Sequence, residues 1–282
     1  MLSNERRYGM SILSGSLELQ EGSKEIVVDS SSPELVATLS EIGFVNRLHD
    51  PLMNPHATER LGTHRDAWRQ NGNTVVFTQG VFDMFHLNHS ALLLYAKMSA
   101  VPFHYNAHET GSWEELTAEQ QFGYTIQSIT SGAIRQIVSI DGNAHVSARK
   151  NSDPDKPSSR PILHWETRAR DVLLASAAVD GMTPNFLADS VTMHDKVRPE
   201  LVGTPHASIT DIASFVSPDV WAIHSDSPQI IAALENDVEG RFSGIQPVIL
   251  QNRGPYEDGF AGEISTSSII QRTIGGIMVD RT

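Results

Sequence analysis

Cysteine is absent from the 282 residues of this chain. Its absence excludes disulfide bonds, zinc sites built from thiolates and cysteine nucleophiles together. Basic residues are also few, since 21 Lys and Arg stand against 34 Asp and Glu and leave a formal net charge of −13. A nucleic-acid-binding surface needs clustered positive charge, so we do not expect nucleic acid as a partner.

Long hydrophobic runs are missing as well. No apolar stretch approaches the roughly 20 residues that a membrane-spanning helix needs. The N-terminal segment MLSNERRYGMSILSG lacks the apolar core of a signal peptide. We therefore expect a cytoplasmic protein without a membrane partner. With 39% hydrophobic residues, the chain is long enough for one large α/β domain, or for one domain and an extension.

The most informative stretch runs from Thr74 to Lys97, with the sequence TVVFTQGVFDMFHLNHSALLLYAK. An apolar run typical of a strand leads into a turn at Gly80, and an apolar helical run follows. A strand, a glycine turn and a helix bring backbone N–H groups up to phosphate in nucleotide-binding α/β folds. His86 and His89 lie three residues apart at the start of this helix and share one face. The pair suits the stabilisation of charge that develops on a phosphoryl group.

The segment GVFDMFHLNH resembles the GxFDxxHxGH signature of the cytidylyltransferase-like nucleotidyltransferases. That family includes glycerol-phosphate, choline-phosphate and ethanolamine-phosphate cytidylyltransferases and heptose-phosphate adenylyltransferases. Asn88 stands where the family has glycine. By this resemblance, the catalytic residues are His86 and His89, and the first nucleotide-binding residues are Gly80, Val81, Phe82, Asp83 and Asn88.

A second motif, ISTSSII at residues 264–270, resembles the family's ISTSxII signature. Hydroxyl residues at the start of an apolar helix leave N–H groups that bind anions well. The resemblance implies that Ser265, Thr266 and Ser267 hold the β- and γ-phosphates. The cytidylyltransferases place an arginine shortly before this motif, and Phe260 occupies that spacing in this chain.

The resemblance covers roughly residues 73–275 and implies an α/β fold, a Rossmann-like parallel sheet flanked by helices. We expect residues 1–72 to be an N-terminal extension of unknown role and residues 73–282 to be the nucleotidyltransferase domain. Residues 101–135 interrupt the family pattern as an insertion, which could be a lid, a substrate wall, a homodimer contact or a decoration without chemistry. A capping-box pattern at 112–115 predicts a helix from there toward Gln121.

Residues 136–140 predict the next strand, which ends at Asp141. The polar stretch that follows has the composition of a mobile surface loop, and it is locally basic. A similar loop in the family carries Lys or Arg toward the triphosphate and the phosphorylated substrate. The resemblance therefore implies a catalytic role for Lys150 and substrate contacts from Asp141, Arg149 and Arg160, although a plain solvated loop explains the composition equally well.

Residues 160–180 predict a helix with one buried face and resemble the family's RPI…R…VLAAL…VD segment. By this resemblance Arg168 is catalytic, since a guanidinium can hold phosphate oxygens bidentately. A surface arginine on an amphipathic helix is the alternative. Residues 181–210 allow no clear prediction, and no role is assigned to the stretch 193–196.

Residues 217–226 predict a strand followed by a polar turn, and residues 246–250 predict another strand, with a helix from 227 to about 234 between them. Asp226 follows the first of these strands, and the resemblance implies that it lines the nucleotide pocket. His224 and Ser225 replace the glycine-containing turn that the family has at this point.

The resemblance implies transfer of AMP or CMP from a nucleoside triphosphate to a small phosphorylated sugar or alcohol, with release of pyrophosphate. Mg²⁺ is the implied cofactor and accompanies the triphosphate. No protein ligand set for a metal is assigned, because His49, His56 and His64 match no ligand spacing. Features of both the adenylyltransferases and the cytidylyltransferases are present, so the nucleotide stays open. The second hypothesis is a nucleotide-binding module with lost or weakened catalysis, and Asn88 is its main motivation.

Overall fold

The computed structural model describes residues 47–150, 161–179, 187–225 and 227–250, without the side chains of 149–150 and 175–179, and the backbone of 9–13, 16–21 and 24–29. It divides into two compact units, Met1–Leu48 and His49–Thr282. In the first unit, β1 (Gly9–Leu13), β2 (Ser16–Glu21) and β3 (Lys24–Asp29) form an antiparallel sheet in the order β1-β2-β3.

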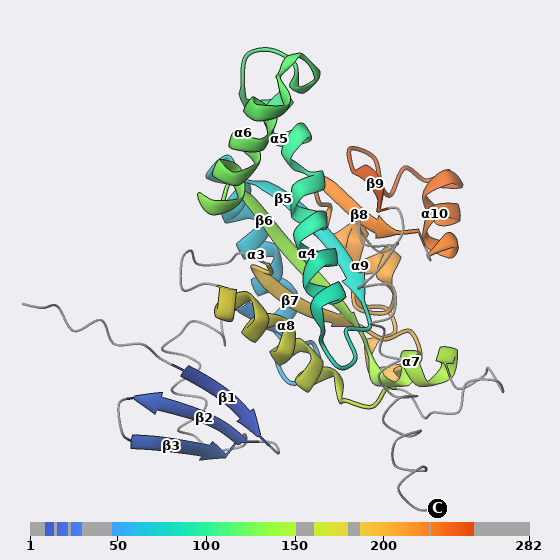
Figure 1. The fold of residues 1–282 in the computed structure, drawn as a ribbon. Helices are drawn as coiled ribbons and strands as arrows, with labels where there is room; N and C mark the ends of the chain where they lie inside the picture. The colour runs from blue at the N-terminus through green and yellow to red at the C-terminus, as the bar shows by residue number, and fades with distance from the viewer. Residues whose placement is uncertain are drawn as a thin grey trace, which may run out of the picture. The chain divides into compact units, whose positions relative to one another are not determined.

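A six-stranded sheet with the order β4-β7-β6-β5-β8-β9 forms the centre of the second unit (Figure 1). Its strands are β4 (Leu48–His49), β5 (Thr74–Gly80), β6 (Ile134–Asp141), β7 (Ser190–His194), β8 (Val220–His224) and β9 (Gln246–Leu250). The pairings β7–β6, β6–β5, β5–β8 and β8–β9 are all parallel. Counted from β5 along the chain, the order is 3-2-1-4-5, as in Rossmann-like folds. The expected Rossmann-like parallel sheet is confirmed.

Helices connect these strands and cover both faces of the sheet. They are α3 (Ala57–Gln70), α4 (Leu87–Ser99), α5 (Val101–His108), α6 (Ala118–Thr130), α7 (Asn143–Lys150), α8 (Trp165–Val179), α9 (Ile209–Val216) and α10 (Pro228–Glu235), with 3-10 turns η1 (Trp113–Glu115) and η2 (Pro199–Leu201). Figure 1 shows α4 running across one face of the sheet. Among the helices that the structure describes, none combines the length and the hydropathy needed to cross a membrane.

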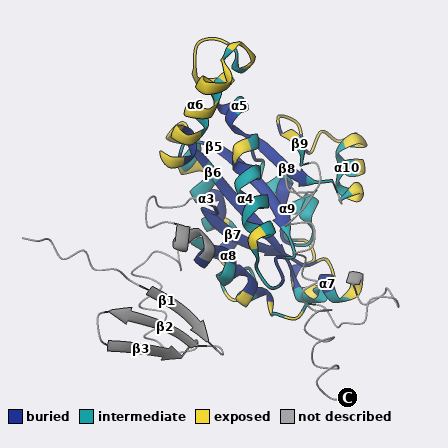
Figure 2. Cartoon of the chain, in the orientation of Figure 1, coloured by how far each residue is buried: buried dark blue, intermediate teal, exposed yellow. Residues whose placement is uncertain are grey.

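Alternate residues of the central strands supply two separate apolar cores. Val75 and Phe77 of β5 pack with α3 and α9, whereas Val76 packs with α4, α5 and α6 on the opposite face. Successive side chains of a strand point to opposite faces, and a sheet covered on both sides is therefore apolar at every position. The central strands β5, β6, β7 and β8 accordingly form the dark, buried centre of Figure 2.

Two local predictions need correction, and one strand was not predicted. The capping box at Ser112 and Glu115 is present, but it caps only the three-residue turn η1, and α6 begins after a second box at Thr117. Part of the polar stretch expected to be a loop is helix α7 (Asn143–Lys150). The strand that was not predicted is β7, which lies in the stretch 181–210. It is a five-residue strand that is buried throughout, and it shows no alternation to reveal it.

A buried ion pair fixes α4 against the start of β7. The ammonium of Lys97 is 2.9 Å from a carboxylate oxygen of Asp189, and both side chains are almost completely shielded from solvent. Asp189 also accepts hydrogen bonds from the guanidinium of Arg135 at 2.9 Å and from the N–H of Gln136 at 2.8 Å. Lys97 is thus bound within the fold, at the amino-terminal edge of the sheet.

His49 is fully buried in the edge strand β4, and its neutral form is favoured by the fold. Burial lowers the pKa of its imidazole to about 3, with nearby His64 a smaller cause. An unfolded histidine has a pKa near 6.5, so between pH 3 and 6.5 the unfolded chain binds more protons than the folded protein. Folding stability therefore rises with pH through this window and is lost as the pH falls below about 6.5.

We expect His49→Gln to flatten this pH dependence. The wild-type free energy of unfolding should fall between pH 7 and pH 5 by about 1–2 kcal/mol more than that of the variant. Urea unfolding at the two pH values measures the difference. The same pH slope in both proteins would show that His49 is not a source of the acid sensitivity.

Candidate active site

The candidate site lies where the parallel strands end, at the carboxyl edge of the sheet. In the β5–β6 register Gly80 lies opposite Ile140, so β5 and β6 end at the same level. The chain proceeds from β5 to β6 and β7 on one side, then returns to β8 on the other side of β5. Ligands of open α/β sheets bind at such a reversal of strand order, outside the carboxyl ends of the strands. For this protein the reversal lies between β5 and β8.

The loop from β5 to α4 has an unusual backbone conformation. Phe82 has a φ of 51° and Met84 has a φ of 50°, a region that bulky side chains rarely adopt. The ring of Phe82 is buried over Gly80, where an added Cβ would lie 2.9 Å from the ring carbon Cε2. Gly80 is therefore needed for close packing. Strained positions of this kind are found at functional loops when the surrounding structure holds them in place.

Asp83 and Arg168 hold this loop from the side of α8. The carboxylate of Asp83 accepts hydrogen bonds from the backbone N–H groups of Ile162 and Leu163 at 3.1 and 3.0 Å. The buried guanidinium of Arg168 donates to the carbonyl oxygens of Val81 at 2.6 Å and Leu163 at 3.1 Å. Both side chains thus bridge the β5–α4 loop and the start of α8.

A third hydrogen bond of Arg168 goes to Oδ1 of Asn143 at 2.8 Å, at the start of α7. Burial lowers the pKa of Arg168, and the carboxylates of Asp83 and Asp141 oppose that shift. In this structure the guanidinium is therefore engaged with protein acceptors on three segments, and it positions them relative to one another. The expected contact between Arg168 and phosphate stays a prediction.

His86 and His89 lie together at the start of α4, as their spacing predicts. Their rings stack with centroids 3.9 Å apart and an angle of 22° between the planes. Burial, with neighbouring His86 as a smaller cause, lowers the pKa of His89 to about 3, and burial also lowers the pKa of His86. Both imidazoles are thus neutral near pH 7, and each can donate one hydrogen bond.

Three buried nitrogen atoms at this end of β5 make no hydrogen bond to any residue that the structure describes. They are Nδ1 of His86, Nδ1 of His89 and Nε2 of Gln79. Buried polar atoms are nearly always satisfied in native proteins, so three such atoms around one loop are typical of a site that binds a polar ligand. The amide oxygen of Gln79 accepts from Nε1 of Trp221 on β8 at 2.9 Å. Sequence reasoning missed Gln79, although it immediately precedes the glycine turn.

The end of β6 carries a second polar cluster, formed by Asp141, His145 of α7 and His194 of β7. One potential ligand atom from each residue lies within 4.8 Å of the others. Asp141 lies opposite His194 in the β6–β7 register, and its carboxylate is 3.3 Å from Nε2 of His194. Asp141 was expected to contact substrate, whereas no role was expected for the two histidines. His194 lies on β7, which the sequence did not reveal.

Gly142 follows Asp141 where backbone segments approach closely. Its N–H donates to the carbonyl oxygen of His194 at 2.7 Å, and a Cβ added to Gly142 would lie 2.6 Å from Cγ of buried Asp195. The carboxylate of Asp195 cannot give way easily, because it accepts hydrogen bonds from the N–H groups of Ala144 and Val197 at 3.0 and 3.1 Å.

We expect Gly142→Ala to destabilise the protein by about 1–3 kcal/mol, the usual cost of overpacking. Gly123→Ala is the matched control, because Gly123 is an exposed position inside α6 with no atom near the added methyl group. That change should stabilise by about 0.5–1 kcal/mol. Urea unfolding of both variants gives the comparison. Equal stability of the two variants would contradict the packing argument.

Several expected site residues lie outside the part of the chain that the structure describes. These are Arg160, Asp226, Ser265, Thr266 and Ser267. The backbones of Arg149 and Lys150 end helix α7, but their side chains are not described. Asn88 occupies the first turn of α4, between the two histidines, and is half-buried. The roles assigned to these residues stay predictions.

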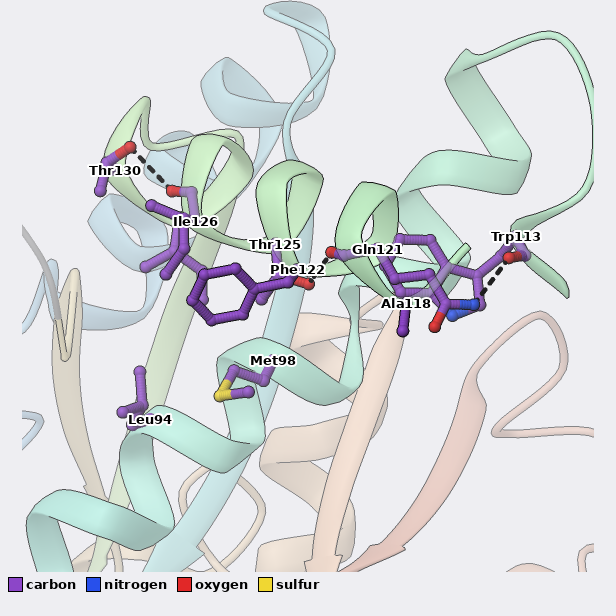
Figure 3. Close-up of a pocket in the computed structure, with 10 residues that line it drawn as sticks. Leu94, Met98, Trp113, Ala118, Gln121, Phe122, Thr125, Ile126 and Thr130 are labelled. Carbon is purple, nitrogen blue, oxygen red and sulfur yellow. Dashed lines mark hydrogen bonds between the residues drawn. The ribbon is translucent and has the colours of Figure 1, made fainter. Parts of the chain in front are cut away.

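Most of the stretch 101–135 forms α5, η1 and α6, and β6 begins at Ile134. The groove between α6 and α4 is mainly apolar. It has a volume of about 360 Å³. Figure 3 shows Phe122 and Ile126 of α6 opposite Leu94 and Met98 of α4. The residues that line the groove include none of those expected at the nucleotide site. The role of the insertion as a lid, a wall or a contact surface remains a prediction.

Comparison with known proteins yields a distant similarity of fold. No protein-family model matches the sequence, and no curated protein matches it. Among solved structures, the chain is similar to a pantoate–β-alanine ligase from Francisella tularensis, crystallised with β,γ-ATP and β-alanine. The two share 10% sequence identity with a TM-score of 0.38, over 77% of this chain and 75% of the ligase chain. At this level the similarity carries no argument about the site.

Proposed function

We propose that this protein is a nucleotidyltransferase that moves AMP or CMP from a nucleoside triphosphate to a small phosphorylated sugar or alcohol. The observation that carries the proposal is the stacked, neutral pair His86 and His89 at the start of α4. The pair lies beside the β5 end of a Rossmann-like sheet, next to the reversal of strand order. Its position agrees with the resemblance between GVFDMFHLNH and the nucleotidyltransferase signature.

The reaction needs no protein nucleophile. A phosphate oxygen of the acceptor attacks the α-phosphorus, the bond between that phosphorus and its bridging oxygen to the β-phosphate breaks, and pyrophosphate leaves with the electron pair. Catalysis then consists of alignment and of donors aimed at the oxygens on which charge develops. His86 and His89 would supply N–H donors to the α-phosphate. Asp83 and Arg168 would keep the loop that carries them in its strained conformation.

We propose further roles for residues whose side chains the structure does not describe. Ser265, Thr266 and Ser267 would hold the departing pyrophosphate at a helix N-terminus. Lys150 and Arg149 would neutralise the phosphates, Arg160 would bind the phosphorylated substrate, and Asp226 would line the nucleotide pocket. These assignments follow from the sequence resemblance.

The described side chains at the carboxyl edge of the sheet include no dedicated set of ligands for the Mg²⁺ expected with the triphosphate. Asp83 uses its two carboxylate oxygens for backbone N–H groups. Asp141 lies among imidazole nitrogens, and Mg²⁺ prefers oxygen ligands in octahedral geometry. We therefore propose that phosphate oxygens of the bound nucleotide supply most of the Mg²⁺ ligands.

The test is pyrophosphate release. The full chain is incubated with Mg²⁺, each nucleoside triphosphate and a panel of phosphorylated sugars and alcohols. Release that depends on both substrates supports the proposal, and the preferred triphosphate decides between ATP and CTP. Nucleotide binding without turnover for any pair would instead support a binding module of the same fold. Asn88 favours that alternative, since a side chain replaces the glycine that lets nucleotide pack on the helix start in the family.

A further inference from the structure

The cluster of Asp141, His145 and His194 has the composition of a metal site. Its three donor atoms come from the end of β6, the first turn of α7 and the end of β7, and all lie within 4.8 Å of one another. The side chains of Asp141 and His194 are 6% and 4% exposed, respectively. His145 is half-buried, so the cluster opens to solvent on the side of α7. The ring centroids of His145 and His194 are 5.8 Å apart.

We propose that Asp141, His145 and His194 bind a divalent transition-metal ion such as Zn²⁺. Two imidazoles and one carboxylate are a donor set suited to Zn²⁺, Fe²⁺, Co²⁺ or Ni²⁺, whereas Mg²⁺ and Ca²⁺ select oxygen ligands. Three protein ligands leave at least one coordination position for water or for an oxygen of a bound molecule. The proposal concerns metal binding alone and is independent of nucleotidyl transfer.

Surrounding contacts orient the proposed ligands. The Nδ1 atom of His194 lies 2.8 Å from the hydroxyl of Ser139, which leaves Nε2 on the side of Asp141. Metal-binding histidines almost always have such a hydrogen bond on the second ring nitrogen, because it sets the tautomer and the ring orientation. Gly142 permits the close approach of β6 and the segment after β7 that brings Asp141 and His194 together.

Two contacts hold the N-terminus of helix α7 in place. Asn143 binds the guanidinium of Arg168, and the N–H of Ala144 donates to the carboxylate of Asp195. These two contacts fix the first turn of the helix, which places His145 beside Asp141 and His194.

The test uses the full chain without a histidine tag, stripped with a chelator. The protein is loaded with Zn²⁺, separated from free ion and analysed by elemental mass spectrometry. Titration with Co²⁺ then reports coordination through visible absorption bands. We expect one equivalent of Zn²⁺ per chain, a Co²⁺ spectrum typical of protein ligands, and a higher melting temperature with Zn²⁺ than without it.

His145→Ala removes a half-buried ligand and should leave the fold intact. We expect it to weaken Zn²⁺ binding at least about tenfold and to abolish the rise in melting temperature. Ser139→Ala should weaken binding by about 10–100-fold through loss of the hydrogen bond that orients His194. His56→Ala is the control, because His56 is exposed on a different element and its ring faces Glu59. It should bind Zn²⁺ like the wild type.

Two results would overturn the metal site. One is a wild-type protein that retains no Zn²⁺ after loading. The other is equal Zn²⁺ affinity in the wild type and His145→Ala, which would show adventitious binding elsewhere. The melting curves of metal-free His145→Ala and metal-free wild type should match. If they do, weaker Zn²⁺ binding by the variant is due to the lost ligand and not to a damaged fold. The metal measurements involve no nucleotide, so their failure would leave the proposed transferase activity untouched.

Discussion

Pyrophosphate release by His89→Ala is expected to be about 10²–10³-fold slower than that of the wild type, the usual effect of removing one donor to a transition-state oxygen. The imidazole of His89 is neutral and stacked on His86, so alanine removes a donor without leaving a buried charge behind. The loss should appear in kcat, because charge builds on the α-phosphate oxygens mainly in the transition state. Steady-state kinetics with the best substrate pair provide the measurement.

The matched control for this change is His108→Ala. His108 is an exposed residue at the end of α5, away from the β5–α4 loop, and its ring is tilted against that of His104, with the centroids 4.5 Å apart. We expect the kcat of His108→Ala to equal that of the wild type. A decrease in kcat of less than about threefold in His89→Ala would correspond to under 1 kcal/mol of transition-state stabilisation. Such a result would exclude a catalytic role for His89.

Loss of the Asp189 carboxylate should have the largest effect on stability. Asp189→Ala removes the carboxylate that lies 2.9 Å from the ammonium of Lys97, a side chain that is fully shielded from solvent. Removing one partner of a buried ion pair typically costs about 3–5 kcal/mol, because the remaining charge loses its counterion in a low dielectric. The hydrogen bonds from Arg135 and Gln136 are lost as well. We expect a decrease of that size in the free energy of unfolding, measured with urea.

Asp66→Ala is the control for the buried pair. The carboxylate of Asp66 is 2.7 Å from the guanidinium of Arg65, but its side chain is 54% exposed. Exposed ion pairs contribute about 0–1 kcal/mol, so this variant should unfold almost like the wild type. If Asp189→Ala is no less stable than Asp66→Ala, the buried Lys97–Asp189 pair contributes no more to stability than an exposed pair does. That result would contradict the prediction.

Local signals in the sequence predicted much of the sheet. β5 and α4 are an apolar run, a glycine turn and an apolar helix in direct succession, and these features depend only on neighbouring residues. β6, β8 and β9 were found in the same way. The capping box at Ser112 is also a local signal, yet how far the helix extends depends on packing, and the chain turns again at Thr117 before α6.

Features that depend on distant residues were not predicted. β7 is short and buried on both faces, and it becomes recognisable only through its pairing with β6. Helix α7 is polar, and contacts from Arg168 and Asp195 define its start. Composition alone therefore indicated a loop where the structure has a helix.

The sequence by itself determined the fold class and the pair His86 and His89, because their spacing and the elements around them are local properties of residues 74–97. Only the tertiary structure revealed the arginine bridge between the loop and α7, the amide nitrogen of Gln79 that finds no acceptor among the described residues, and the cluster around Asp141. The members of that cluster come from β6, α7 and β7, and Asp141 meets His194 only because their strands are paired. Parallel pairing brings together residues that are far apart in the chain, and no local pattern records which strands will be neighbours.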